Sequence, residues 1–471
     1  MHLLLWAATA VAADVTVAAG EDWCAAVNAA SPGDTITLEA GEYAGPCVLR
    51  ASGEAGAPIT VAGEGAAIVY TGSSSNVLDV YSSHLVLRGL GFGPTQADID
   101  AIKIREGEDI VVTDNTFLQV GGISVSANSA DTRDVVISDN TFEDLQATGI
   151  YLGCHDGSCA SSAFEIRGNR VDGVTSSAVG YAMETKLNSY GTIAENTVYN
   201  AQGPAIEVYG STAGDTTVVE RNLAIGSRSS ATLEIGGGPA IVRHNVVIGG
   251  AGAAMSLYDY GGRGLVADIA VQGNTLWGVG DAAVSLSGWA ADQGLRFEGN
   301  AVGRDDGGTA LPGAIDGVPM DGNVDCADGA ACWVDAAAWR LWPRADGALA
   351  GAGVEAAPPL TEDWCGAPRP TPPTAGALEP GTGEEAAFSA TATAATLCMT
   401  GPGETGGPGE TGGPGETGEP GDTHEPGDTQ AKAADPAVCG CAAGGASGPW
   451  IGAVALALAV RRRRPRPADR H

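Results

Sequence analysis

The chain has 471 residues, of which 71 are glycine, and its formal net charge at pH 7 is −33. Abundant glycine with few aromatic residues is typical of short strands and tight turns, so we expect one long, repetitive all-β domain that acts as a monomer. The charge argues against nucleic acid as a partner, and it would repel a polyanion unless a cation or a local basic patch intervened.

Residues 1–13 read MHLLLWAATAVAA and combine an apolar run with small residues at Ala10 and Ala12. This pattern predicts a signal peptide that is cleaved near Asp14, and therefore an exported protein. No lysine or arginine precedes the apolar run, so an ordinary first strand remains the alternative.

Ten cysteines in an exported chain favour disulfide bonds. Proximity along the chain pairs Cys154 with Cys159, Cys326 with Cys332 and, more widely, Cys24 with Cys47. A zinc site is disfavoured because the cysteine spacings do not repeat and the chain has only six histidines.

Residues 14–345 contain an internal repeat. Short motifs such as DNTF, GNRV and ENTV recur every 23 to 29 residues and place asparagines at Asn115, Asn140, Asn169, Asn196, Asn222, Asn245, Asn274 and Asn300. Alternating apolar strands separated by polar turns at this period predict a parallel β-helix of about ten coils. The asparagines are expected to be structural, because a stacked turn residue can hydrogen-bond along the stack and tolerates left-handed backbone.

The strand before each asparagine predicts a column of outward-facing side chains, since neighbouring residues of a strand point to opposite faces. This column is expected to read Lys103, Ser124, Tyr151, Glu184, Glu207, Glu234, Ser256 and Ser285. A second outward column, two residues later, includes Lys186 and Tyr209. We therefore expect three stacked glutamates on one open face, with a lysine and a tyrosine beside them.

Two longer stretches bracket this face, GCHDGSCASS at 153–162 and YDYGGRG at 258–264. Loops on both sides would form the walls of a groove whose rim holds Tyr151, His155, Tyr258 and Arg263. A charged floor with tyrosines between two walls is suited to binding a saccharide.

The chemistry of Glu184 and Lys186 is open, because they face the same way and form either a catalytic pair or a neutralised one. A lysine base needs a lowered pKa, whereas nearby carboxylates raise the pKa, so a charge-balanced binding face is favoured. A calcium ion among the glutamates would reverse this balance. Stacked glutamates such as Glu207 and Glu234 also lie in the separation range of about 5 to 9.5 Å that glycosidases use. The remaining alternative is an adhesive or structural surface spike without catalysis.

The stretch AVNAASPGDTITLEAGEYAGPCVLRASGEAGAPITVAGEG resembles the first coil of exported β-helix proteins of the pectin-lyase-like superfamily, notably the chondroitinase B and alginate lyase group. The resemblance extends loosely over 21–303 and implies a right-handed parallel β-helix that acts on a polysaccharide. In those lyases a lysine before an asparagine-threonine turn is the base, which implies that role for Lys186. The next coil has Val208 and Tyr209 where the family has arginine and histidine, and the family's calcium-holding acids lie further upstream than Glu184.

Three further segments are expected after the body: a cap at 346–370, a flexible stalk rich in Pro, Gly, Thr and Glu at 371–438, and an anchor at 439–471. The last segment places Cys439 and Cys441 before an apolar run that closes on an arginine cluster, which orients the arginines to the cytoplasm. This order resembles the MYXO-CTERM sorting signals. The resemblance implies sorting machinery as a partner and display on the cell surface, and a plain membrane anchor is the alternative.

Overall fold

The computed structural model describes residues 12–176, 180–280, 282–355, 358–383 and 385–398. The chain divides into two units, Met1–Thr405 and Gly406–His471, and every described residue lies in the first. Most of the predicted signal peptide, the stalk from 399 onward and the sorting motif with Cys439 and Cys441 lie outside the described residues.

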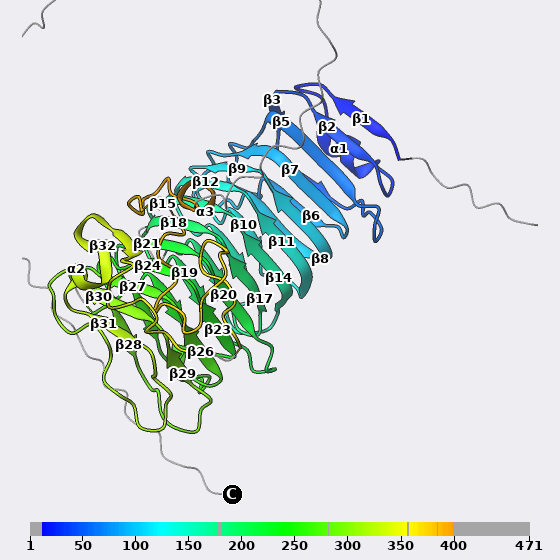
Figure 1. Cartoon of the computed structure of the whole chain (residues 1–471). Helices are drawn as coiled ribbons and strands as arrows, with labels where there is room; N and C mark the ends of the chain where they lie inside the picture. Colours follow the sequence, from blue (N-terminus) through cyan, green and yellow to red (C-terminus); the bar gives the residue numbers. More distant parts are fainter. Residues whose placement is uncertain (1–11, 177–179, 281, 356–357, 384, 399–471) are drawn as a thin grey trace, which may run out of the picture. The chain divides into compact units, whose positions relative to one another are not determined.

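The described chain winds into stacked coils whose strands pair in parallel with the next coil, which confirms the predicted β-helix (Figure 1). The series that carries the candidate site comprises β4 (Cys47–Leu49), β6 (Leu78–Tyr81), β8 (Ile102–Thr113), β10 (Val125–Ala127), β13 (Ile150–Leu152), β16 (Met183–Thr185), β19 (Ile206–Val208), β22 (Leu233–Ile235), β25 (Met255–Leu257) and β28 (Val284–Leu286).

Two further series complete each coil. The second comprises β1 (Asp14–Val17), β2 (Thr35–Leu38), β5 (Ile59–Val69), β7 (Leu85–Phe92), β11 (Thr132–Ser138), β14 (Ser161–Arg167), β17 (Tyr190–Ala194), β20 (Thr217–Glu220), β23 (Ala240–Arg243), β26 (Ile269–Gln272) and β29 (Arg296–Glu298). The third comprises β3 (Gly41–Ala44), β9 (Thr116–Leu118), β12 (Thr141–Leu145), β15 (Arg170–Val174), β18 (Thr197–Ala201), β21 (Leu223–Ser227), β24 (Val246–Ile248), β27 (Thr275–Gly278), β30 (Ala301–Arg304) and β31 (Val324–Cys326). The long strands β5, β7 and β8 each take part in two series.

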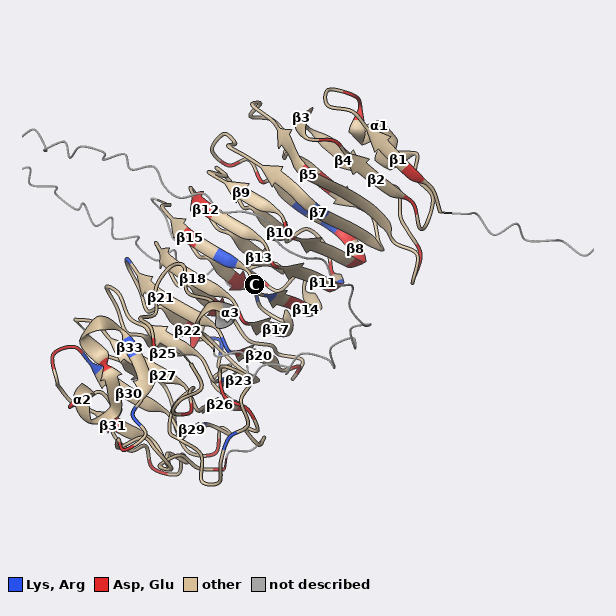
Figure 2. Ribbon diagram, turned by 45° about the horizontal axis from the view of Figure 1, so that its top comes forward, with Lys and Arg blue, Asp and Glu red and all other residues tan. Residues whose placement is uncertain are grey.

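The core runs along the inside of the coils, where equivalent apolar residues stack on one another. Phe92, Phe117 and Phe142 are buried with parallel rings, and the ring centroid of Phe117 lies 5.2 Å from that of Phe92 and 4.7 Å from that of Phe142. Acidic residues, by contrast, are distributed along the whole stack (Figure 2).

We expect Phe117→Leu to lower the free energy of unfolding by roughly 1–2 kcal/mol, because it removes two ring contacts and leaves a small void. Urea unfolding followed by circular dichroism measures the change. Phe297→Leu, at a buried phenylalanine outside this stack, is the control for loss of volume alone. Equal losses in both variants would show that the stack adds nothing.

The asparagines form a continuous buried ladder, as predicted. From Asn140 onward, the side-chain oxygen of each asparagine accepts hydrogen bonds from the backbone N–H and the side-chain amide of the preceding one, at 2.9–3.1 Å. Asn323 extends the ladder beyond Asn300 and was missed in the sequence. The residue before each asparagine has a positive φ, which is 55° at the first of these residues, Asp114, and 65° at the last, Gly322. The left-handed position is therefore that neighbour and not the asparagine.

The three predicted disulfide bonds, Cys24–Cys47, Cys154–Cys159 and Cys326–Cys332, are present. At the N-terminal end, helix α1 (Trp23–Asn28) covers the first coils with the buried side chains of Trp23 and Val27, and Cys24 joins this helix to β4. A fourth bond, Cys365–Cys398, was not predicted.

The C-terminal part of the described chain packs on the outside of the coils. It begins with α2 (Gly329–Cys332), β32 (Trp333–Asp335), η2 (Ala336–Ala338) and the antiparallel β33 (Arg340–Pro343), and it ends with α3 (Ala394–Leu397). Figure 1 shows the orange segment that carries α3 beside β15 and β18. There the side chains of Arg170 and Thr197 donate hydrogen bonds to the carbonyls of Ala390 and Ala392, at 3.1 and 3.0 Å.

The predicted boundary at residue 371, between cap and stalk, is therefore misplaced. Leu378, Phe388 and Leu397 are buried in a second apolar cluster with outward-facing residues of β21 and β24, such as Leu223 and Val246. The Pro, Gly and Thr content of this stretch suggested a stalk, but its scattered apolar residues cover the coils as far as residue 398. No helix within the described ranges is long and apolar enough to cross a membrane.

Candidate functional site

The candidate site lies on strands β13, β16, β19 and β22, which bring the predicted glutamates together. Parallel pairing places Tyr151 beside Glu184, Glu184 beside Glu207, and Glu207 beside Glu234. The column is therefore as predicted on these coils. It was wrong on an earlier coil, where Ser126, and not Ser124, lies in register with Lys103 and Tyr151.

The floor of the site is buried, whereas the sequence predicted an open face. The exposed fraction is 1% for Glu184, 3% for Lys186, 0% for Glu207 and 1% for Tyr209. Glu234, Tyr151 and Tyr258 are half-buried and surround this floor. Alternation along the strands correctly showed which way these side chains point, but it carried no information about what covers them.

Lys186 occupies the centre of the floor. Its ammonium group pairs with Glu184 and donates a hydrogen bond to Tyr209 Oη at 2.9 Å. Tyr209 Oη in turn donates to Glu184 Oε1 at 3.3 Å. Lys186 Nζ also lies 4.1 Å from the ring centroid of Tyr209 and 4.6 Å from that of Tyr151, which is within the range of cation–π attraction.

Burial determines the proton balance of the Glu184–Lys186 pair. It lowers the pKa of Lys186 in spite of the opposing charges of Glu184 and Glu207, and the charge of Arg263 lowers that pKa further. Burial also raises the pKa of Glu184 in spite of Lys186. Both shifts favour the neutral forms. The carboxylates do raise the pKa of Lys186, as the sequence argument held, but that argument omitted desolvation, which outweighs them.

Glu207 and Glu234 form a second pair of adjacent carboxyl groups. Both side-chain oxygens of Glu207 are buried without a geometric hydrogen-bond partner in the described chain. Burial, followed by the charge of Glu234, raises the pKa of Glu207 well above its usual range. Glu234 Oε2 accepts a hydrogen bond from Tyr258 Oη at 3.0 Å, whereas burial favours the neutral form of Glu207.

The two predicted walls meet above the floor and cover it. Arg263 Nη2 donates to the carbonyl of His155 at 3.3 Å, and the Arg263 guanidinium lies 5.0 Å from the ring centroid of Tyr209. The His155 ring meets the Tyr209 ring edge-on at 5.6 Å. His155 and Arg263 were predicted as rim residues, and the structure places them in the cover instead.

Tyr260, on η1 (Tyr260–Gly262), and Tyr181 belong to the site and were missed. The Tyr260 ring packs 4.1 Å from that of Tyr209, and Lys186 Nζ lies 5.5 Å from the ring of Tyr181. Tyr260 fits because Gly236 lacks a side chain: a Cβ there would lie 2.6 Å from Tyr260 Cβ. Tyr260 stands in the loop that the sequence singled out, whereas Tyr181 precedes its strand and gave no periodic signal.

Four tyrosines of the site have raised pKa values, which favour their protonated forms: Tyr151, Tyr181, Tyr209 and Tyr258. Burial, followed by the charge of Glu184, raises the pKa of Tyr151 and of Tyr181. Burial is also the main cause of the raised pKa values of Tyr209 and Tyr258. Burial lowers the pKa of His155, and the charges of Lys186 and Arg263 lower it further. The site therefore offers phenolic hydroxyl groups as hydrogen-bond donors and a neutral imidazole.

The calcium hypothesis does not fit the donor arrangement. Among the residues that the structure describes, no group of three or more His, Cys, Asp or Glu side chains is placed to hold a metal ion. Glu184 is engaged by Lys186 and Tyr209, and Glu234 by Tyr258. The carboxylates therefore do not converge on one point.

Residues 95–185 match the family model described as "Right handed beta helix region". An alginate lyase from Paenibacillus sp. str. FPU-7 is 18% identical, with 58% of this chain and 97% of that chain covered and a TM-score of 0.45. A polysaccharide lyase from Pseudopedobacter saltans is 15% identical, with 66% and 92% covered and a TM-score of 0.43.

The A-module of a mannuronan C-5 epimerase from Azotobacter vinelandii is 14% identical, with 58% of this chain and 80% of that module covered and a TM-score of 0.43. No curated protein matches the sequence. These likenesses concern the fold alone. The chain is a right-handed parallel β-helix, and its candidate site lies on the outer face of the strand series that runs from β4 to β28.

Proposed function

We propose that this protein binds a saccharide chain at the floor formed by Glu184, Lys186, Glu207 and Tyr209, with Glu234 beside it. The observation that carries the proposal is the gathering of tyrosine rings: those of Tyr151, Tyr181 and Tyr209 lie around Lys186 on three consecutive coils, and the ring of Tyr260 packs on that of Tyr209. Tyrosine combines an apolar ring with a polar hydroxyl group, so a cluster of tyrosines can contact both the ring face and the hydroxyl groups of a sugar.

Entry of a ligand requires movement of the cover. Its contacts across the site are one hydrogen bond from Arg263 to the backbone of His155, ring contacts among His155, Tyr209 and Tyr260, and cation–π contacts of Arg263 with both tyrosine rings. The loop that carries Tyr260 is rich in glycine and has φ values of 67° and 66° at Gly261 and Gly262. A loop of this kind can be displaced without breaking a strand, and its tyrosines would then contact the bound chain.

Cleavage by elimination at a uronate is the second candidate, and the lowered pKa of Lys186 favours it. A neutral lysine amine can accept the proton next to the uronate carboxyl group, and a neighbouring tyrosine hydroxyl can protonate the leaving oxygen. Tyr209 is placed for the second role because its hydroxyl lies 2.9 Å from Lys186 Nζ. Hydrolysis by Glu207 and Glu234 would instead use the protonated carboxyl as acid and its neighbour as base or nucleophile.

We also propose that the chain is exported and held at the cell surface through its C-terminal segment, with sorting machinery as a partner. The proposal rests on the apolar N-terminal run and on the order of cysteine, apolar run and arginine after residue 438. Protease treatment of intact cells should remove the β-helix, and complete protection of the protein would contradict surface display.

A panel of polysaccharides tests the function, with Lys186→Met as the main variant. We expect at least one glycan to retard the protein in affinity electrophoresis. Lys186→Met and Tyr260→Ala should each weaken the affinity for that glycan about tenfold or more. Lys103→Met is the matched control, because Lys103 lies on the same strand series and pairs with Asp100 at 3.2 Å.

The products distinguish the candidate activities. Elimination would give unsaturated products that absorb in the ultraviolet and depend on Lys186, whereas hydrolysis would give reducing ends without that absorbance and depend on Glu207. Binding without products would leave an adhesin. Folded protein that neither binds nor cleaves any member of the panel would overturn the saccharide proposal and indicate a structural spike.

A further inference from the structure

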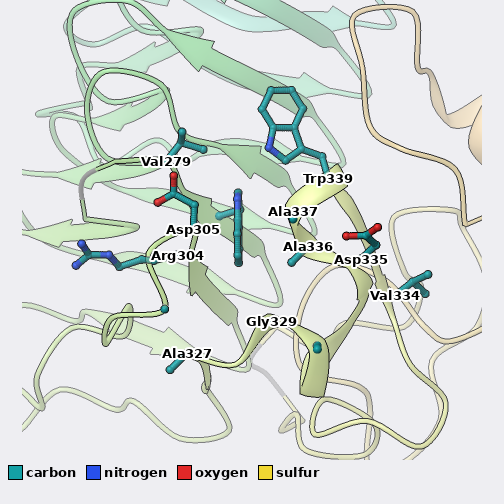
Figure 3. Close-up of a pocket in the computed structure, with 13 residues that line it drawn as sticks. Val279, Arg304, Asp305, Ala327, Gly329, Val334, Asp335, Ala336, Ala337 and Trp339 are labelled. Atoms are coloured by element: carbon teal, nitrogen blue, oxygen red, sulfur yellow. The ribbon is translucent and has the colours of Figure 1, made fainter.

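A second concave site lies away from the tyrosine cluster, between the last coils and the hairpin that β32 and β33 form. It is a pocket of about 470 Å³ that includes Trp277 on β27, Arg304 on β30, and Asp335 and Trp339 beside η2. Figure 3 shows Asp305 and Val279 on the coil side, and Trp339 and Asp335 on the hairpin side. The volume falls in the range of small-ligand sites, which is about 300–1,000 Å³.

Trp339 is held in an unusual backbone conformation at the edge of this pocket. Its φ and ψ angles are 54° and 30°, a left-handed region that bulky residues rarely occupy. Two backbone hydrogen bonds fix it there: its N–H donates to Ala336 O at 3.0 Å, and its carbonyl accepts from Phe388 N–H at 3.1 Å. The half-buried indole is thus held in place by the packed C-terminal segment.

The charge of the pocket lining is negative. Asp305 Oδ1 accepts the N–H of Gly280 at 3.0 Å, and Asp335 Oδ1 accepts the N–H of Ala338 at 3.2 Å. Within the described ranges the second oxygen of each carboxylate accepts no hydrogen bond, so it is available to a ligand. Arg304, the basic residue of the lining, already donates to Asp306 at 2.7 Å, and Figure 3 shows its side chain extending away from Trp339.

The remaining lining residues are glycine, alanine and valine, without a hydroxyl or amide side chain. A neutral sugar needs donors as well as acceptors, and this pocket presents mainly carboxylate acceptors and indole rings. A cation with an alkyl surface needs only negative charge and aromatic faces. Tryptophan is the best aromatic partner for such a cation.

We propose that the pocket lined by Trp277, Trp339, Asp305 and Asp335 binds an organic cation with an alkylated ammonium group. The indoles contact the alkyl surface of this group, and the two carboxylates supply the opposing charge. The proposal is independent of the saccharide site, because none of its residues belongs to the floor or to the cover.

Calorimetric titration of the full chain with choline tests the proposal, with 3,3-dimethylbutan-1-ol as an uncharged probe of the same shape. We expect choline to bind and the alcohol to bind at least about tenfold more weakly, since it lacks the charge. Added salt should weaken choline binding.

Asp305→Asn combined with Asp335→Asn should lower choline affinity about tenfold or more, while asparagine retains both backbone hydrogen bonds. Trp339→Gly, which suits the left-handed position, should lower it as well. Asp346→Asn, at an exposed residue paired with Arg344 at 3.5 Å, is the control and should leave binding unchanged. Absent choline binding, equal binding of the alcohol, or Trp339-dependent binding of a neutral oligosaccharide in place of choline would each overturn the proposal.

Discussion

Asn196→Leu is expected to lower the free energy of unfolding by roughly 3–6 kcal/mol, because it interrupts the asparagine ladder where no water reaches. Asn196 is fully buried and donates to Ile166 O and Asn222 Oδ1 at 2.9 Å. Its oxygen accepts the backbone and side-chain N–H groups of Asn169, at 2.9 and 3.0 Å. Leucine has a similar size but leaves these partners unsatisfied.

Urea unfolding followed by circular dichroism measures this loss. Asn76→Leu is the matched control, because Asn76 is a half-buried loop asparagine outside the ladder that donates to Asp79 at 3.0 Å. The control should lose about 1 kcal/mol or less. If both variants lose the same amount, the ladder has no strength beyond that of its separate hydrogen bonds.

The ladder was predictable because it follows the period of the fold. One coil is one repeat, so a residue with the same role recurs every 23 to 29 residues and becomes visible without any partner information. The left-handed position before each asparagine was not recognised, since Asp114, Glu195, Arg221 and His244 all occupy it and share no side-chain chemistry.

The candidate site was predictable only in the part that follows the repeat. Alternation along a strand determines which side chains point outward, and this placed Glu184, Glu207 and Glu234 in register. Exposure depends instead on the path of loops that break the repeat, and the contact of Arg263 with His155 joins residues 108 positions apart. The lowered pKa of Lys186 follows from its burial, and the identities of the outward-facing residues do not show whether they are buried.

The packing of the C-terminal segment after residue 371 could not be predicted from its composition. Its Pro, Gly and Thr content resembles that of the stalk that follows it, so composition suggested one flexible region from residue 371. Phe388 and Leu397 are too far apart to make a periodic pattern, yet both are buried against the coils. Irregular segments that pack on a solenoid leave no repeat by which to find them.

Glu207→Gln is expected to make the protein more stable at pH 8 and to flatten the dependence of its stability on pH. Burial raises the pKa of Glu207 well above the ordinary value of 4.5, so the folded chain retains a proton that the unfolded chain releases. The stability that this group contributes is therefore complete below about pH 4.5. It declines by about 1.4 kcal/mol per pH unit as the pH rises from there, until the pH has passed the raised pKa of the folded state. Glutamine has nearly the same shape and cannot ionise.

Urea unfolding of both proteins between pH 5 and pH 9 measures the effect, and the stability difference should shrink toward the acidic end. Glu42→Gln, at an exposed glutamate on β3, is the control and should follow the wild-type profile. Parallel profiles for Glu207→Gln and wild type would show that Glu207 is ionised when folded. In that case Glu207 carries a charge beside Glu234, and the hydrolytic candidate loses the protonated carboxyl group of Glu207 on which it depends.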